Sequence, residues 1–203
     1  LLPVLTKHMG AYAKLHYAFV SNFRSHIAMW PSWTEVVEWY WGVLCDAAKD
    51  GASVSLHHDD DDDMVMYPYR WIVLSLRLLH ATLDRWQRNR PAGTMFAGTS
   101  GAQFELQMVD VLLKTYLRLT PTDLERWQAH PEQFAIEEDQ GDVELDIRPA
   151  ATELMRALSR HSFRSGKGAA PEVPNVSDYM WMQFEASAQW PLTLEGVLAR
   201  EVV

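Results

Sequence analysis

The sequence predicts an all-α protein built as an α–α superhelix, a solenoid of stacked helices. Apolar residues recur at intervals of three and four in segment after segment, and no segment shows a convincing strand pattern. Nine tryptophans are many for 203 residues, and such large side chains usually fill wide seams between helices. Roughly seven helices in sequential order favour an open solenoid over a closed bundle, so residues 1–203 are expected to form a single solenoid segment.

The N-terminal half is expected to contain three of these helices. A first helical run covers about residues 5–23, and Gly10 is expected to weaken it. Ser32, with Glu35 three residues later, matches a capping box, so a second helix is expected to start there. The third helix, at about residues 68–90, contains a stretch that is apolar on more than one face, which predicts neighbours on two sides.

The most distinctive stretch follows a helix that is expected over about residues 102–119. Thr120 is placed to cap a short helix with Pro121 at its first position, where the missing backbone N–H costs nothing. Pro131 is expected to end that short helix. An acidic crossing loop over residues 131–146 then leads into another long amphipathic helix.

Two further loops and the chain ends complete the expected organisation. Residues 57–63 are expected to form an acidic loop, because consecutive aspartates repel one another and do not pack. Residues 164–176 are expected to form a flexible loop, followed by two final helices capped by Ser177 and Thr193. Because the sequence lacks an initiator Met and stops within an apparent helix, we expect a fragment of a longer chain.

The net charge of −9 is concentrated in two of these segments. Asp59–Asp63 supply five acids and residues 132–146 seven more, and removing these 12 from 27 acids leaves 15 against 18 basic residues. Such segments repel phosphate backbones and attract basic protein partners, so direct nucleic-acid binding is not expected. Solubility alone is the open alternative. The candidate partner-binding residues are Asp59, Asp60, Asp61, Asp62, Asp63, Glu137, Glu138, Asp139 and Asp142.

No combination of residues predicts catalysis. Cys45 is the only cysteine, which excludes an internal disulfide, and its apolar helical setting indicates an inert thiol. His57 and His58 adjoin the aspartates, but contiguous ligands on a mobile loop do not hold the fixed geometry that a metal site needs. The stretch at residues 165–168 lacks the first glycine and the Ser/Thr of a phosphate loop. We therefore expect no enzyme, cofactor, metal site or membrane insertion.

One motif in the second half carries a resemblance to a known family. The pattern Trp-x-x-x-Pro-Glu-x-Phe at residues 127–134, then an acidic run and Arg-Pro at residues 148–149, resembles the importin-beta superfamily, most closely its importin eleven branch. His130 departs from the pattern, because the family usually has Asp before Pro-Glu. The Trp and Phe can still anchor the crossing segment, and each proline can mark a helix boundary. The motif residues expected to be structural are Trp127, Pro131, Glu132, Phe134, Arg148 and Pro149.

The resemblance implies a HEAT-repeat solenoid that acts as a nuclear transport receptor, or karyopherin. Such receptors carry protein cargo through nuclear pores and exchange it in response to the GTP-bound form of Ran. The implied partners are basic protein cargo, Ran GTPase and nuclear pore proteins, and the implied location is the nucleus and cytoplasm. Two alternatives stay open: a helical scaffold or adaptor of another class, and a helical metalloenzyme with its site near His57 and His58.

Overall fold

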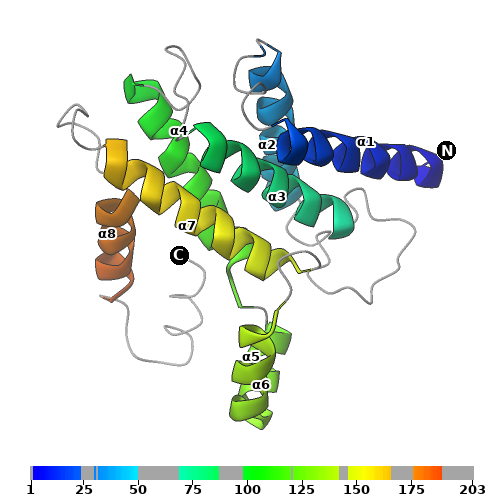
Figure 1. The fold of residues 1–203 in the computed structure, drawn as a ribbon. Coiled ribbons are helices and arrows are strands. Elements are labelled where there is room, and N and C mark those ends of the chain that lie inside the picture. Colours follow the sequence, from blue (N-terminus) through cyan, green and yellow to red (C-terminus); the bar gives the residue numbers. More distant parts are fainter. Residues whose placement is uncertain are drawn as a thin grey trace.

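The computed structural model describes residues 2–23, 30, 32–49, 69–86, 98–119, 121–141, 146–165 and 176–188. Within these ranges every regular element is a helix, which confirms the all-α prediction (Figure 1). The elements are α1 (Leu2–Asn22), α2 (Trp33–Lys49), α3 (Tyr69–Trp86), α4 (Gly98–Val111), the π-helical turn η2 (Leu112–Tyr116), α5 (Pro121–Ala129), α6 (Pro131–Asp139), α7 (Ile147–Ser165) and α8 (Val176–Ala188). The expected acidic loop at 57–63, most of the expected loop at 164–176 and the helix expected from Thr193 lie outside the described residues.

Helix α3 is the centre of the molecule. It packs against α1 on one side and α7 on the other, so these three helices form one layer (Figure 1). Helix α2 packs against α3, while α4 and α8 pack against α7 and against each other. Stacked helices of this kind, each contacting its neighbours in the layer, form the extended core of a solenoid.

The residues of α3 explain its central place. Its apolar side chains occupy more than one face, and neighbours on both sides bury them, as the sequence predicted. Ser75 is a buried polar residue of α3, so its hydroxyl needs a hydrogen-bond partner. It donates to the Trp71 carbonyl one turn earlier, at 2.7 Å. The buried apolar residues of α3 are Trp71, Ile72, Val73, Leu76, Leu78, Leu79 and Leu83.

The end of α4 is a π-helical turn, where the sequence predicted a regular helix up to residue 119. The Leu117 N–H donates to the Leu112 carbonyl at 2.8 Å, one residue further back than in an α-helix. Leu112 and Tyr116 are both buried in this wider turn, and the Tyr116 hydroxyl donates to the Leu44 carbonyl of α2 at 2.7 Å. The turn thus joins two helices that are distant in sequence.

The crossing segment is more helical than the sequence predicted. Residues 131–139 form α6, so the prediction of a loop over all of 131–146 is wrong for this part. Pro131 does end α5, but it also takes the first position of α6, where a proline N–H is not needed. Glu132 in the first turn suits the positive end of the helix dipole, and no glycine interrupts the chain before Gly141.

Helices α5 and α6 form a hairpin, called here the α5–α6 hairpin (residues 121–139). The two helices pack against each other and project away from the layer of α1, α3 and α7 (Figure 1). The hairpin connects η2 to α7, which places its base beside the N-terminal end of α7. The hairpin therefore separates η2 from α7 in sequence, while α7 still packs against α3 and α4.

Gly10 lies inside α1, and the helix continues through it. A Cβ atom at this position would meet no heavy atom within 4 Å. Gly10→Ala is therefore expected to raise the free energy of unfolding by about 0.5–1 kcal/mol, because alanine loses less backbone entropy in a helix. Thermal unfolding followed by circular dichroism tests this, and an unchanged or lower midpoint would contradict it.

His16 gives the chain a built-in pH dependence. Its Nδ1 lies 3.0 Å from the hydroxyl of Tyr40, and burial lowers the pKa of His16 below its ordinary value of 6.5. Burial also raises the pKa of Tyr40 to about 12, so this hydroxyl stays protonated. The pair is neutral in the folded chain at neutral pH.

The free energy of unfolding is expected to fall as pH drops below about 6.5, the ordinary pKa of histidine. In that range the unfolded chain binds a proton at His16 that the folded chain binds less readily, so acid favours unfolding. Chemical unfolding at several pH values tests this. His16→Gln should flatten the profile, whereas replacing the exposed His8 should not; equal profiles for the two variants would contradict the assignment.

Candidate functional site

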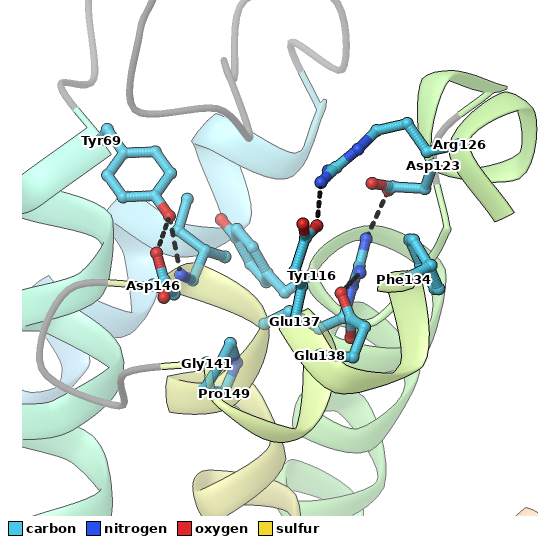
Figure 2. Close-up of a pocket in the computed structure, with 12 residues that line it drawn as sticks. Tyr69, Tyr116, Asp123, Arg126, Phe134, Glu137, Glu138, Gly141, Asp146 and Pro149 are labelled. Carbon is cyan, nitrogen blue, oxygen red and sulfur yellow. Dashed lines mark hydrogen bonds and ion pairs between the residues drawn. The ribbon is translucent and has the colours of Figure 1, made fainter. Parts of the chain in front are cut away.

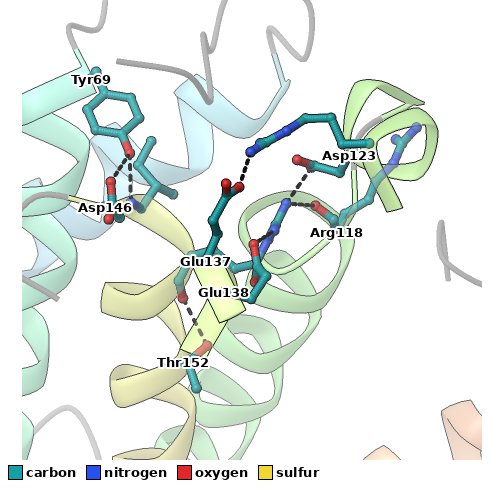
Figure 3. Close-up of polar contacts among 10 residues, drawn as sticks. Tyr69, Arg118, Asp123, Glu137, Glu138, Asp146 and Thr152 are labelled. Atoms are coloured by element: carbon teal, nitrogen blue, oxygen red, sulfur yellow. Dashed lines mark hydrogen bonds and ion pairs between the residues drawn. The ribbon is translucent and has the colours of Figure 1, made fainter. Parts of the chain in front are cut away.

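Arg148, near the start of α7, ties both helices of the hairpin to the solenoid layer. Its guanidinium donates to the Asp123 carboxylate of α5 at 2.5 Å and also pairs with Glu138 of α6 (Figure 3). A longer bond of 3.5 Å reaches the carbonyl of Arg118. The Asp123 side chain is only 4% exposed and that of Arg148 20% exposed, so this contact is shielded from water. One side chain therefore fixes the base of the hairpin.

Tyr69, the first residue of α3, forms a second joint with the start of α7. Its hydroxyl donates to Asp146 Oδ1 at 3.3 Å and accepts the Ile147 N–H at 3.1 Å (Figure 3). That N–H belongs to the first turn of α7 and would otherwise lack an intrahelical acceptor. Burial raises the pKa of Tyr69, so the hydroxyl remains a donor at neutral pH. The joint fixes α7 against α3.

Gly141 and Pro149 complete the base of the hairpin. A Cβ atom at Gly141 would lie 2.7 Å from Pro149 Cγ and 3.3 Å from the Glu138 carbonyl oxygen. The backbone after α6 therefore passes against the proline ring in the first turn of α7, at a distance that no side chain allows. Glycine is required here by close approach.

A cavity of about 280 Å³ lies between the Tyr69 joint and the hairpin. Tyr69 and Asp146 lie on one side of it, and Arg126, Asp123 and Phe134 on the other (Figure 2). Its carboxylates outnumber its guanidinium groups, since Asp123, Glu137, Glu138 and Asp146 face only Arg126 and Arg148. The cavity can thus attract a cation, although its two arginines already engage three of the four acids.

The predicted motif residues differ in how deeply the structure buries them. Phe134 is half-buried and lines the cavity, and Pro149 lies in the first turn of α7. Trp127 is 52% exposed, so its anchoring of the crossing segment stays a prediction. The contact that the structure shows at the base of the hairpin is the ion pair of Arg148 with the buried Asp123.

The predicted partner-binding acids fall into three groups. Glu137 pairs with Arg126 and Glu138 with Arg148, and both side chains stay about two-fifths exposed, at 42% and 40%. Asp139 ends α6, and its side chain is not described. Asp59–Asp63 and Asp142 lie outside the described residues, so their proposed role stays a prediction.

Sequence reasoning missed Tyr69, Asp123 and Arg126. Tyr69 and Arg126 carried no motif, because their partners lie 77 and 11 residues away. Asp123 gave one usable signal: it is the acid in the first turn of a short capped helix, and such acids often bond within their own helix end. Here it bonds Arg148, 25 residues away, a pairing that spacing cannot indicate.

The described residues offer no sign of a reactive centre. No group of three or more His, Cys, Asp or Glu side chains in the described ranges is placed to hold a metal ion, and His57 and His58 fall outside these ranges. Cys45 is half-buried, and burial raises the pKa of its thiol, which favours the protonated form. Among the same ranges, no helix combines the length and apolarity needed to cross a membrane.

Comparison with known proteins supports the predicted fold and class. No protein-family model matches the chain. A structure described as that of Lph2, a novel bidirectional nuclear transport receptor in S. cerevisiae, superposes with a TM-score of 0.63 at 20% identity. The superposition covers 93% of this chain and 18% of that one. This likeness confirms the predicted fold, a segment of an all-α solenoid.

Two curated relatives extend the comparison to sequence. The importin beta-like protein KAP120 of Saccharomyces cerevisiae is 40% identical over 52 residues, which are 26% of this chain and 5% of the relative. The importin beta-like protein kap113 of Schizosaccharomyces pombe is 23% identical over 163 residues, which are 77% of this chain and 14% of the relative. These two relatives support the resemblance to the importin-beta superfamily that the sequence predicted. The chain's placement in the importin eleven branch stays a prediction.

Proposed function

We propose that the chain is a segment of a nuclear transport receptor that binds protein cargo and responds to Ran-GTP. The observation that best supports this is the solenoid likeness to a nuclear transport receptor across 93% of the chain. The segment corresponds to 18% or less of each compared protein, so cargo and Ran binding belong to a longer assembly of repeats. Solenoids suit this work because stacked repeats present a long adaptable surface.

The proposed cargo is basic protein. The cavity at the hairpin base carries more carboxylates than guanidinium groups, and Glu137 and Glu138 stay partly exposed despite their ion pairs. Exposed ion pairs contribute about 0–1 kcal/mol and exchange readily, so an incoming lysine or arginine can compete for these acids. The acids Asp59–Asp63, Asp139 and Asp142 extend this proposal along the sequence. Shuttling between nucleus and cytoplasm through contacts with nuclear pore proteins is part of the same proposal, as is the lack of catalysis.

The deciding experiment is a binding assay with the longer protein that contains this chain. Immobilised receptor is incubated at low salt with Ran carrying either a non-hydrolysable GTP analogue or GDP, in the presence and absence of a basic cargo domain. Binding of the GTP form alone, coupled to a change in cargo binding, is the expected result. Equal failure of both forms of Ran to bind would count against a receptor and favour a scaffold or adaptor.

Two cheaper measurements address the remaining alternatives. Metal analysis of the purified chain should find no stoichiometric zinc or iron; a tightly held metal would support the metalloenzyme alternative at His57 and His58. Replacing Asp59–Asp63 by serine should weaken binding of a basic partner, chiefly at low salt, because screening shortens the reach of charge at high salt. An unchanged affinity would leave that run with a solubilising role.

A further inference from the structure

The α5–α6 hairpin buries very little of its own surface. Asp123 is the only buried side chain among its described residues, and Leu124 and Phe134 are half-buried. Its other described side chains are exposed, including the large apolar groups of Trp127 at 52% and Ile136 at 56%. Burial of apolar surface is the dominant favourable term in folding, so the hairpin lacks the stabilisation that the apolar core gives to the layer.

The two helices of the hairpin are also too short to be stable alone. Each has nine residues, whereas an isolated helix shorter than about 12 residues is marginal in water. An ion pair between Arg126 and Glu137 joins them, but its side chains are 51% and 42% exposed. Exposed pairs of this kind contribute little to stability. The helical state of the hairpin therefore depends on its attachment to the layer.

Arg148 supplies that attachment through polar contacts. Its guanidinium engages the buried Asp123 of α5, Glu138 of α6 and the carbonyl of Arg118 (Figure 3). A cavity of about 280 Å³ lies beside these contacts, so the packing at the base is incomplete (Figure 2). Burial deprives the Asp123 carboxylate of hydration, and the buried Arg148 Nε has no hydrogen-bond partner among the described residues. Opening of the hairpin hydrates both groups, which lowers the cost of opening.

The packing of the layer does not pass through the hairpin. Helix α7 packs against α3 and α4, and the Tyr69 hydroxyl holds the start of α7 through Asp146 and the Ile147 N–H. None of these contacts involves residues 121–139. The layer can therefore stay folded when the hairpin opens, which is the condition for local unfolding.

We propose that the α5–α6 hairpin is a separate folding unit, which unfolds and refolds while the layer of α1, α3 and α7 stays intact, and that Arg148 is its latch. Engagement of Asp123 by Arg148 closes the latch and holds both helices in place. A partner that contacts only the folded hairpin shifts this equilibrium toward the folded form, so its binding is coupled to ordering of the hairpin. The inference does not depend on the proposed function, since it holds for a transport receptor and for a scaffold alike.

Native-state proteolysis of the purified chain by a glutamate-specific protease, followed by mass spectrometry, tests the proposal. The exposed Glu132 and Glu137 are the hairpin sites, and the exposed Glu38 of α2 is the layer site. Cleavage needs a locally unfolded chain, so its rate follows the population of the open form when opening and closing are fast. The hairpin sites are expected to be cut about tenfold faster than the layer site, or more.

Three arginine variants identify the latch. Arg148→Met is expected to speed cleavage at the hairpin sites about a hundredfold and to leave the layer site unchanged, because the docked form then buries Asp123 without its cation. Arg126→Met removes only the exposed pair within the hairpin, so it should speed cleavage there about threefold or less. Arg156→Met removes an exposed pair of α7 and is the matched control, which should change neither rate.

Three outcomes would overturn the proposal. Equal cleavage rates at the hairpin sites and the layer site in the unaltered chain would show that the hairpin and the layer unfold together. Equal acceleration of both kinds of site by Arg148→Met would show the same dependence, because the substitution would then unfold the whole chain. Equal effects of Arg148→Met and Arg156→Met at the hairpin sites would mean that the contact with the buried Asp123 is not the latch.

Discussion

Replacing Arg148 by methionine is expected to weaken the attachment of the α5–α6 hairpin by about 3 kcal/mol. Methionine keeps the apolar stem but leaves the Asp123 carboxylate, which is only 4% exposed, without its cation. Burying an uncompensated charge costs several kcal/mol, far more than the pair itself contributes. Hydrogen exchange of the backbone amides of residues 121–141 measures the effect directly, and these amides should exchange faster by more than a hundredfold.

A matched control and a second substitution make the Arg148 result specific. Arg156→Met removes an arginine from the same helix whose ion pair with Glu153 is exposed, and it should cost less than about 0.5 kcal/mol. Adding Asp123→Asn to Arg148→Met should restore part of the loss, because the neutral amide needs no counter-charge. If Arg148→Met behaves like Arg156→Met, the buried ion pair is not what holds the hairpin.

Gly141→Ala is expected to destabilise the same joint by about 1–3 kcal/mol, the usual range for overpacking. Its Cβ would lie 2.7 Å from Pro149 Cγ, and a proline ring cannot swing aside as a flexible side chain can. Chemical unfolding and hydrogen exchange at the end of α6 test this. Gly42→Ala is the control, since a Cβ there meets nothing within 4 Å; like Gly10→Ala, it should stabilise the chain by about 0.5–1 kcal/mol. Equal effects at the two glycines would show that the contact with Pro149 is not tight.

The helical boundaries were predictable where local chemistry sets them. The capping box at Ser32 and Glu35 predicted the start of α2, which begins at Trp33 with the Val36 N–H bonded to the Ser32 carbonyl at 3.3 Å. The helix expected after residue 146 likewise begins there, since α7 starts at Ile147. The apolar stripes of α3 and α7 predicted their burial, because helical periodicity and burial share one cause.

What the sequence could not reveal depends on contacts between distant residues. The acidic run at 131–139 suggests a loop because neighbouring acids repel one another. In the fold, Arg126 and Arg148 form ion pairs with two of these acids, Glu137 and Glu138. Trp127 suggests a buried anchor only if the hairpin lies against the body, and whether it does so is a tertiary property. The π-helical turn at Leu112–Tyr116 has no known sequence signal here, since its residues suit an ordinary helix.

The attachment of the hairpin at one corner also bears on how such chains diverge. Because α3 packs directly against α7, the hairpin does not lie between these two helices, and a hairpin of another length is expected to leave their packing unchanged. Insertions, deletions and changes of charge in the hairpin are expected to change its surface and to leave the packing of the solenoid helices unchanged. Relatives that differ in length between these two helices are expected to keep the same α3–α7 spacing, which superposition of their structures can check. Partner choice can thus evolve separately from the curvature of the scaffold.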